Sequence, residues 1–439
     1  MEARYLPQID MPPLDLPSSI QAALADADKR LAHRPKLQRL FRNCFPNTLE
    51  TTTKLLADGT TFVITGDIPA SWLRDSVEQV IHYIPYAKGD SDLQRIISGL
   101  IKRHTEYVLI DPYANAFNES ANEWHWDPSD ETDMSPWVWE RKFEIDSLCF
   151  VIRLVYSYWQ ATQTTDIFTG DFRRAMRVIV ELFKREQRHA EQSPYRFARH
   201  NGVQEDTLGN NGLGMPVNYT GMIWSGFRSS DDACEFHYNI PGNMFAVVTL
   251  RQMQEIATEV YRDLSFREEL RQLELEVERG IKLYGIYRHP QFGPIYAYET
   301  DGYGNYCLMD DAGTPGLLSI PYLGYTGSDD PIYQNTRRFA LSKENPFHFE
   351  GKAAQGIGSP HTPPGYIWHM ALSMQGLTAS CNEEKLAMIA MLEATDADTG
   401  YMHEGFLADD PHVYTREWFA WSNSLFSQLI LQALEEDIL

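Results

Sequence analysis

The stretch LCFVIRLVYSY (residues 148–158) decides the fold class of this chain. Its apolar side chains recur at three- and four-residue spacing, which is the period of a helix that buries one face. The segment 93–101 has the same spacing. Further stretches are compatible with helices: 170–192, 243–284, 366–380, 384–394 and 416–436. The sequence therefore predicts a mostly helical, all-α protein.

Long connections separate these predicted helices. They are rich in Gly, Pro, Asn and Asp and exceed the usual loop length, so we expect them to carry function: 110–136, 200–222, 287–315 and 343–365. Short β-like pieces such as 61–65 predict hairpins within them. No linker-like segment divides the chain, which predicts one domain over 1–439. Helices with long aromatic loops suggest a toroid whose loops gather at one end. No internal sequence repeat is visible, so the sequence does not give the number of helical hairpins.

Charge and composition narrow the possible partners. The formal net charge of −23 argues against nucleic acid and anionic membranes, which need clustered Lys and Arg. No segment approaches the roughly 18 apolar residues that span a bilayer. Residues 1–7 lack a signal-peptide pattern, which favours the cytoplasm. Two glycosylation triplets, NES (118–120) and NYT (218–220), leave secretion as the alternative. We expect a monomer.

The five cysteines are scattered and lack C-x-x-C spacing. This pattern fits reduced, mostly buried thiols better than a disulfide framework or a zinc site. No EF-hand, phosphate loop, dinucleotide fingerprint or nucleophile elbow is present either. The sequence predicts no metal or other cofactor.

Acidic residues lie among aromatic residues in three separated motifs: FRSSDDAC (227–234), YMHEGF (401–406) and TREWFAW (415–421). Glycosidic bond cleavage uses two carboxyl groups, one to protonate the leaving oxygen and one to activate water or attack the sugar. Aromatic rings offer flat apolar surfaces to a sugar. The motifs therefore point to a glycosidase. The alternatives are that Asp231 and Asp232 cap a helix beginning near Ala233 and that Glu404 is a surface acid.

A fourth motif, TGDIPASWLRDS (65–76), places an arginine beside acids and a tryptophan. Its Pro and Ser predict a helix start that puts Trp72, Arg74 and Asp75 in the first turn. An Arg–Asp pair can hold neighbouring sugar hydroxyls, since Arg donates in a fixed fork and Asp accepts twice. A structural salt bridge is the alternative.

Further candidate residues lie in three other segments. Trp126 belongs to an aromatic and polar loop that is either a substrate wall or a packed Ω-loop. In ERKFEIDS (140–147), helical spacing predicts that Glu144 and Ser147 share a face and that Asp146 points elsewhere. Capping is the alternative for this segment. His361 is a sugar ligand or a structural histidine.

With these motifs the chain resembles glycoside hydrolase family 125, the exo-acting α-1,6-mannosidases. The matching strings keep one order over most of the chain: TGDIPASWLRDS (65–76), DPYANAFN (111–118), ERKFEIDSLC (140–149), FRSSDDAC (227–234), IPGNMFAVV (240–248), LMDDAGTPGLLSIPYLGY (308–325), GIGSPHTPPGYIW (356–368), and the pieces 401–406 and 415–421. Slight departures at 312–314, 369 and 405 affect loop shape and the expected aglycone preference.

The resemblance implies an (α/α)6 toroid of helical hairpins that removes terminal mannose from α-1,6-linked mannosides, mannan or N-glycan fragments, with inversion and without a metal. It implies Asp231 as general acid, with Asp232 close behind, and Glu404 as general base, with Glu417 as the fallback. It also suggests residues that hold the terminal mannose: Asp67, Trp72, Arg74, Asp75, Trp126, Glu144, Asp232, Asn243 and His361.

The implied mechanism makes two physical demands. Inversion needs the two carboxyl groups to lie about 6.5–9.5 Å apart, because this separation leaves room for the attacking water molecule. The acid must be protonated, so we expect burial or the adjacent aspartate to raise its pKa. Two alternatives remain: a mannoside-binding protein without turnover, and another toroid enzyme such as an epimerase or lyase. Epimerases and lyases normally use His or Tyr as the base, and no paired His motif is present.

Overall fold

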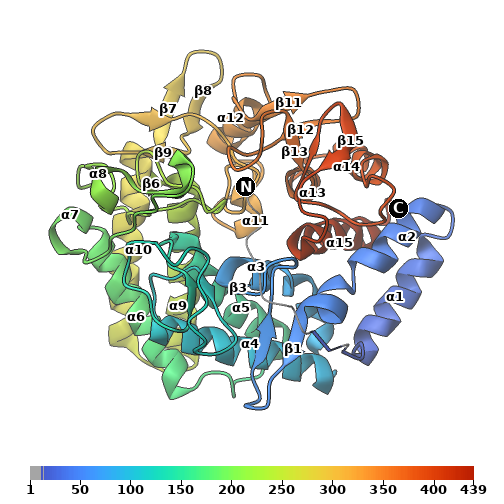
Figure 1. Ribbon diagram of the computed structural model, residues 1–439, viewed down its shortest axis with the longest axis horizontal. Helices are drawn as coiled ribbons and strands as arrows, with labels where there is room; N and C mark the ends of the chain where they lie inside the picture. The colour runs from blue at the N-terminus through green and yellow to red at the C-terminus, as the bar shows by residue number, and fades with distance from the viewer. Residues whose placement is uncertain (1–10, 13) are drawn as a thin grey trace.

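The computed structural model describes residues 11–12 and 14–439 and is mainly helical (Figure 1). The prediction about residues 1–7 lies outside this range. The helices are α1 (Ser18–Arg30), α2 (Pro35–Cys44), α3 (Leu73–Glu78), α4 (Ser91–Ile110), α5 (Ile145–Thr162), α6 (Gly170–Glu186), α7 (His189–Gln192), α8 (Gly209–Gly212), α9 (Ile240–Glu259), α10 (Leu264–Tyr284), α11 (Ile320–Leu323), α12 (Pro331–Ala340), α13 (His369–Leu377), α14 (Asn382–Ala394) and α15 (Ala420–Glu435).

Short strands occupy the connections: β1 (Thr53–Leu55), β2 (Thr61–Val63), β3 (Ser71–Trp72), β4 (Ala116–Phe117), β5 (Val138–Glu140), β6 (Tyr238–Asn239), β7 (Ile286–His289), β8 (Gly293–Tyr296), β9 (Glu299–Thr300), β10 (Tyr306–Cys307), β11 (His348–Glu350), β12 (Gln355–Ile357), β13 (Tyr366–Trp368), β14 (Gly405–Leu407) and β15 (Asp410–Tyr414). They form antiparallel two-stranded sheets β1-β2, β7-β8 and β11-β12, and three-stranded sheets β3-β4-β5, β10-β9-β6 and β13-β14-β15.

The helices form two concentric layers, which confirms the expected all-α (α/α)6 toroid. In the inner layer α3 packs against α5, α5 against α9 and α9 against α11, while α13 packs against α15 and α15 against α3. Outside them, α4, α10 and α14 pack against α5, α9 and α13. The chain runs once around the ring, so that α15 returns to lie against α2 (Figure 1).

The inner helices are buried on most of their surface because they contact neighbours on both sides and the outer layer behind them. Every residue of α3 is buried, including Arg74, Asp75 and Glu78. Charged side chains in such a position must find partners, because burying an unpaired charge is costly. We propose that the chain forms one domain, since a single cluster of buried apolar side chains extends from Ile20 to Leu434.

Several predicted elements differ from those observed. The stretch 243–284 is two helices, because Asp263 accepts a hydrogen bond from the Phe266 amide and caps α10. The stretch 366–380 begins as β13 before α13 starts. The alternative that Asp231 and Asp232 cap a helix beginning near Ala233 is wrong: that segment is a loop, and α9 begins at Ile240. The hairpin predicted around 61–65 is confirmed as β1-β2.

The described residues bear on two expectations from the sequence, glycosylation at the two triplets and the absence of a membrane-spanning segment. The Asn118 side chain is 1% exposed and donates to the Trp124 and Pro136 carbonyls, so that triplet is not available for glycosylation in the folded protein. The Asn218 amide donates to the Gly302 carbonyl. No helix within residues 11–12 and 14–439 is long and apolar enough to cross a membrane.

Gly66 joins the first and last parts of the ring, where it bridges Phe419. Its φ is +137°, and a Cβ there would lie 2.3 Å from the Trp418 carbonyl oxygen. We expect Gly66→Ala to lower the thermal midpoint well below that of Gly59→Ala. Gly59 also has positive φ, but a Cβ there meets nothing within 4 Å. Gly59→Ala should therefore lower the free energy of unfolding by only about 1–2 kcal/mol. Equal midpoints, measured by calorimetry, would contradict this.

Candidate active site

Arg74 is the centre of a buried group of acids at the start of α3. Its Nη1 donates to Glu144 Oε2 at 2.6 Å and to Asp146 Oδ2 at 3.2 Å, and its Nη2 donates to Asp231 Oδ1 at 2.6 Å. Its Nε lies 3.4 Å from Asp75 Oδ1. One guanidinium therefore organises carboxyl groups from α3, the start of α5 and the 227–234 loop.

The loop carrying the two adjacent aspartates turns sharply at Asp231, whose φ is +66°. The turn sends the two carboxyl groups apart, as predicted for neighbouring residues. Asp231 faces Arg74, whereas Asp232 accepts hydrogen bonds from His361 Nδ1 at 3.0 Å and Ser230 Oγ at 3.0 Å. The Asp231 side chain is 22% exposed and that of Asp232 only 3%. Asp231 is therefore the more accessible member of the pair.

The pKa values of Glu144 and Asp231 in this group are shifted in opposite directions. Burial raises the pKa of Glu144 well above its usual value, and the neighbouring Asp231 raises it further. Burial also raises the pKa of Asp231, but Arg74 and a hydrogen bond from Glu144 outweigh burial and lower it below the usual range. The expected rise in the pKa of Asp231 is thus not found, because its charge partners lie elsewhere in the chain.

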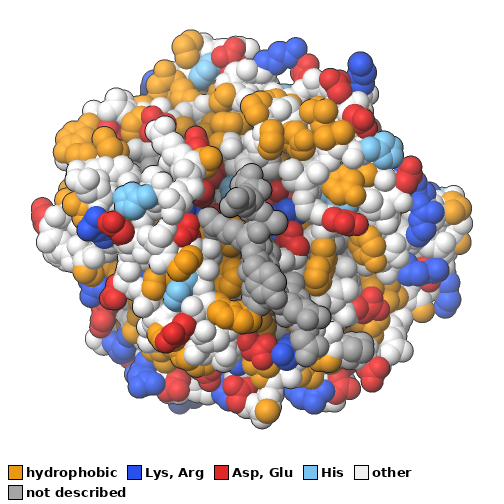
Figure 2. All heavy atoms as spheres, viewed as in Figure 1, with side chains coloured by type: hydrophobic (Ala, Val, Ile, Leu, Met, Phe, Trp, Pro, Cys, Tyr) orange, Lys and Arg blue, Asp and Glu red, His pale blue; other side chains and the backbone are white. Residues whose placement is uncertain are grey.

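Glu404 lies directly before β14 and faces a second arginine. Its Oε1 is 3.6 Å from Arg416 Nη1, and its side chain is 7% exposed. Arg416 also donates from Nε to Asp67 Oδ1 at 3.0 Å. His361 connects the two halves of the site, since Asp232, Glu404 and Asp231 all act on its charge. The structure therefore brings Asp231 and Glu404 to one polar centre, and acidic side chains are visible around the middle of this face (Figure 2).

Tryptophan rings form part of the surroundings. Trp72 packs with Trp139 in a small apolar cluster against which the half-buried Trp126 lies, with the Trp126 and Trp139 rings 6.4 Å apart. Trp421 lies under the Arg74 guanidinium at 5.6 Å. Some buried polar atoms here make no hydrogen bond within the described residues, and such groups can serve a sugar's hydroxyls: Trp72 Nε1, Asp75 Oδ1, Asp311 Oδ2, Trp418 Nε1 and Trp421 Nε1.

Two residues named from the sequence do not join this centre. Asn243 is fully buried and exchanges hydrogen bonds with the backbone of Ile223 and Asn239, so it positions the chain before α9 and has no polar atom left for a sugar. Glu417 is exposed, and its backbone hydrogen-bonds to His403. Glu404, by contrast, is buried and lies 3.6 Å from Arg416 Nη1.

Sequence reasoning missed three residues of the centre. Asp146 was expected to point away from Glu144, yet both contact Arg74. Arg416 pairs with Asp67 across 349 residues, a contact that no local pattern reveals. Lys142 is buried and donates to the Asp231 carbonyl at 2.7 Å, which fixes the turn. Charged residues inside predicted buried segments were the available signal, because such charges need partners.

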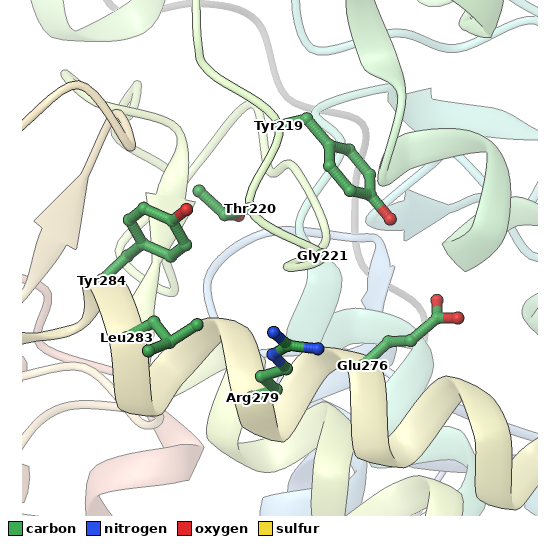
Figure 3. Close-up of a pocket in the computed structure, with 7 residues that line it drawn as sticks. All are labelled: Tyr219, Thr220, Gly221, Glu276, Arg279, Leu283 and Tyr284. Carbon is green, nitrogen blue, oxygen red and sulfur yellow. The ribbon is translucent and has the colours of Figure 1, made fainter.

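A separate pocket lies on the outer surface, between α10 and the loop 219–221 (Figure 3). Its volume is about 350 Å³, and Tyr219, Arg279 and Tyr284 are among its lining residues. It contains none of the carboxyl groups described above. Among the described residues, no group of three or more His, Cys, Asp or Glu side chains is arranged to hold a metal ion.

His361 is expected to stay positively charged at neutral pH. Burial lowers its pKa, but Asp232 more than offsets this and raises it to about 10. Because the folded pKa exceeds the unfolded one, the stabilisation is complete below about pH 6.5 and disappears as pH rises through 10. Ring-nitrogen NMR should show an imidazolium at pH 8. Asp232→Asn should make it neutral there; an imidazole already neutral in the unaltered protein would refute the assignment.

Comparisons with known proteins agree with one another. A family model described as the metal-independent α-mannosidases of glycoside hydrolase family 125 matches residues 34–431. The meiotically up-regulated gene 157 protein of Schizosaccharomyces pombe is 39% identical over 445 residues, covering 95% of this chain and 86% of that protein. One similar structure comes from a study of metal-independent α-mannosidases and is a Streptococcus pneumoniae protein in a non-productive complex with α-1,6-mannobiose. It is 45% identical to this chain and superposes with a TM-score of 0.93, covering 95% of this chain and 98% of that one.

More distant structures share the fold alone. Glycosidases that are 13 or 14% identical to this chain superpose with TM-scores of 0.52–0.57. They cover at least 92% of this chain. The toroid therefore extends beyond the nearer relatives.

Proposed function

This chain belongs to glycoside hydrolase family 125, the metal-independent α-mannosidases, and from that premise we propose that it releases terminal mannose from α-1,6-linked mannosides with inversion. It is a glycoside hydrolase. The α-1,6 linkage is proposed because the relative with 45% identity and a TM-score of 0.93 is in complex with α-1,6-mannobiose. The natural substrate would be a mannan or an N-glycan fragment, bound by a monomer, with neither nucleic acid nor membrane as partner.

Asp231 is the general acid in this proposal. Its greater exposure supports it over Asp232, whose oxygens are occupied by His361 and Ser230. Asp231 gives its proton to the glycosidic oxygen as the bond to the anomeric carbon breaks. Asp232 instead keeps His361 charged and oriented, and Arg74 keeps Asp231 in place.

Glu404 is the general base. It takes a proton from the water that attacks the anomeric carbon on the face opposite the leaving oxygen, so an α-mannoside yields β-mannose. Arg416 Nη1 lies 3.6 Å from Glu404 Oε1 and positions this carboxyl. Asp67 in turn holds Arg416 at 3.0 Å. Asp67, Asp75 and His361 are the polar groups best placed to contact the terminal sugar, and Trp72 and Trp126 line its apolar side.

Proton NMR of the protein with α-1,6-mannobiose tests this function. We expect β-mannose in the first minutes, before mutarotation. Initial α-mannose would refute inversion, and no cleavage despite binding would favour a mannoside-binding protein. Asp231→Asn should abolish most turnover, whereas Asp232→Asn should retain more of it. The reverse order would transfer the acid role to Asp232.

A further inference from the structure

We propose that Glu144 stores the proton that Asp231 delivers to the glycosidic oxygen, with Arg74 holding the two carboxyl groups together as a proton-sharing pair. This inference rests on the proposed function, because it assumes that Asp231 is the acid. It gives Glu144 a role other than the sugar contact expected from the sequence. Glu144 is a positioning residue here, since it acts through Asp231.

The geometry provides the pair. Arg74 donates from its two terminal nitrogens to Glu144 Oε2 and Asp231 Oδ1, each at 2.6 Å, so both carboxyl groups lie along one edge of a planar group. The Glu144 side chain is fully buried, and Ser147 Oγ and Asn115 Nδ2 donate to its oxygens at 2.9 and 3.2 Å. These contacts fix the Glu144 carboxyl group behind Asp231. It therefore reaches the substrate only through Asp231.

The charge balance supplies the proton. Four carboxyl groups contact Arg74, so their charges would outnumber the guanidinium charge if all were ionised in this buried place. Repulsion and burial then favour protonation of one of them. The other titratable and charged groups that face the pair come from the neighbouring segments: Asp75, Lys142, Asp146, His361 and, through Lys142, Glu140 and Asp206.

Glu144 is the member that best holds a proton. It is the more deeply buried of the two, and it shares a hydrogen bond with the ionised Asp231. Asp231 also receives the positive fields of Lys142 and His361, which favour its carboxylate. In the resting enzyme the pair is therefore Glu144–COOH with Asp231–COO⁻.

The proton then follows a balanced path. When substrate displaces water from Asp231, the proton moves from Glu144 to Asp231 and on to the leaving oxygen as the glycosidic bond breaks. Water adds its hydroxide to the anomeric carbon and gives its own proton to Glu404. Glu404 releases that proton to solvent, and the pair regains one from solvent through the exposed Asp231. The net reaction is hydrolysis of one glycosidic bond.

Infrared spectroscopy of the substrate-free protein tests where the proton lies, independently of activity. At pH 7 we expect a carboxylic-acid C=O band that is lost in Glu144→Gln. Glu299→Gln is the matched control, because Glu299 is equally buried but paired with Arg228 at 2.5 Å and should contribute no such band. Asp231→Asn should make the band titrate at lower pH. A band unchanged in Glu144→Gln would refute the proposal.

Kinetics with two leaving groups test what the proton does. Dinitrophenyl α-mannoside needs little acid assistance, so Glu144→Gln should lose about a hundredfold in kcat on α-1,6-mannobiose and only a few-fold on the dinitrophenyl substrate. Equal losses on both substrates would mean that Glu144 is merely structural, and no loss on either would also refute the proposal. If the unaltered enzyme cleaves neither, the proposed function fails while the infrared result still stands.

Discussion

Glu404→Gln is expected to lower kcat on α-1,6-mannobiose roughly a hundred- to ten-thousand-fold, the usual contribution of a general base. Glutamine keeps the shape of the side chain but cannot accept a proton from water. The binding of mannobiose should change little, because the carboxyl group acts on water and not on the leaving sugar. Initial rates and calorimetric titration measure the two effects separately.

Azide sharpens this test, since it attacks without a general base. Added azide should restore cleavage of dinitrophenyl α-mannoside by Glu404→Gln and give the β-mannosyl azide. Glu417→Gln addresses the alternative base and should retain near-normal kcat, because Glu417 is exposed outside the polar centre. Loss of activity in Glu417→Gln with retention in Glu404→Gln would transfer the base role to Glu417.

Arg74→Met is expected to lower the free energy of unfolding by about 3–5 kcal/mol. It should also abolish nearly all activity. The guanidinium is 3% exposed and partners Glu144, Asp146 and Asp231, so its removal leaves buried acids without a counter-charge. Urea denaturation measures the loss. Arg95→Met is the control: Arg95 is exposed and lies 3.7 Å from exposed Asp92, so it should change stability by less than about 1 kcal/mol.

The deficit in Arg74→Met should also depend on pH. Arg74 lowers the pKa values of Asp75, Glu144, Asp146 and Asp231, so all four folded pKa values rise when the guanidinium is removed. Such groups destabilise the fold as pH increases past the unfolded pKa, near 4 for Asp and Glu. The difference from the unaltered protein should therefore be larger at pH 8 than at pH 5. A difference that is independent of pH would mean that Arg74 stabilises the fold by packing.

Much of the fold was predictable from the sequence. The inner helix α5 is recognisable because it is mostly apolar, and its neighbours and the outer layer bury most of its residues. Helices α1, α2 and α12 were not predicted: α1 buries only Ile20 and Ala27, and α2 and α12 have only ten residues each. The boundary between α9 and α10 was missed although Asp263 is a strong capping residue, because the apolar period continues across it.

The site was predictable where a motif is local and not where partners are distant. The divergence of Asp231 and Asp232 follows from their adjacency and is confirmed by their separate partners. The prediction for Asp146 was wrong because it assumed that Glu144 is helical. Glu144 is extended, with φ −119° and ψ 120°, so helical spacing does not apply between the two residues. The Arg416–Asp67 contact joins opposite ends of the sequence and needed the fold.

Closure of the ring has a consequence for how activity arises during folding. Asp67 and Arg74 come from the first turn of the toroid and Glu404 and Arg416 from the last, and they meet only when α15 lies against α2 and α3. Contacts between such remote segments form slowly, because a long loop must close first. In a partly folded chain the proposed acid Asp231 and the proposed base Glu404 are therefore not yet brought together. Hydrolysis begins only when the circle is complete, which makes catalysis a readout of the finished fold.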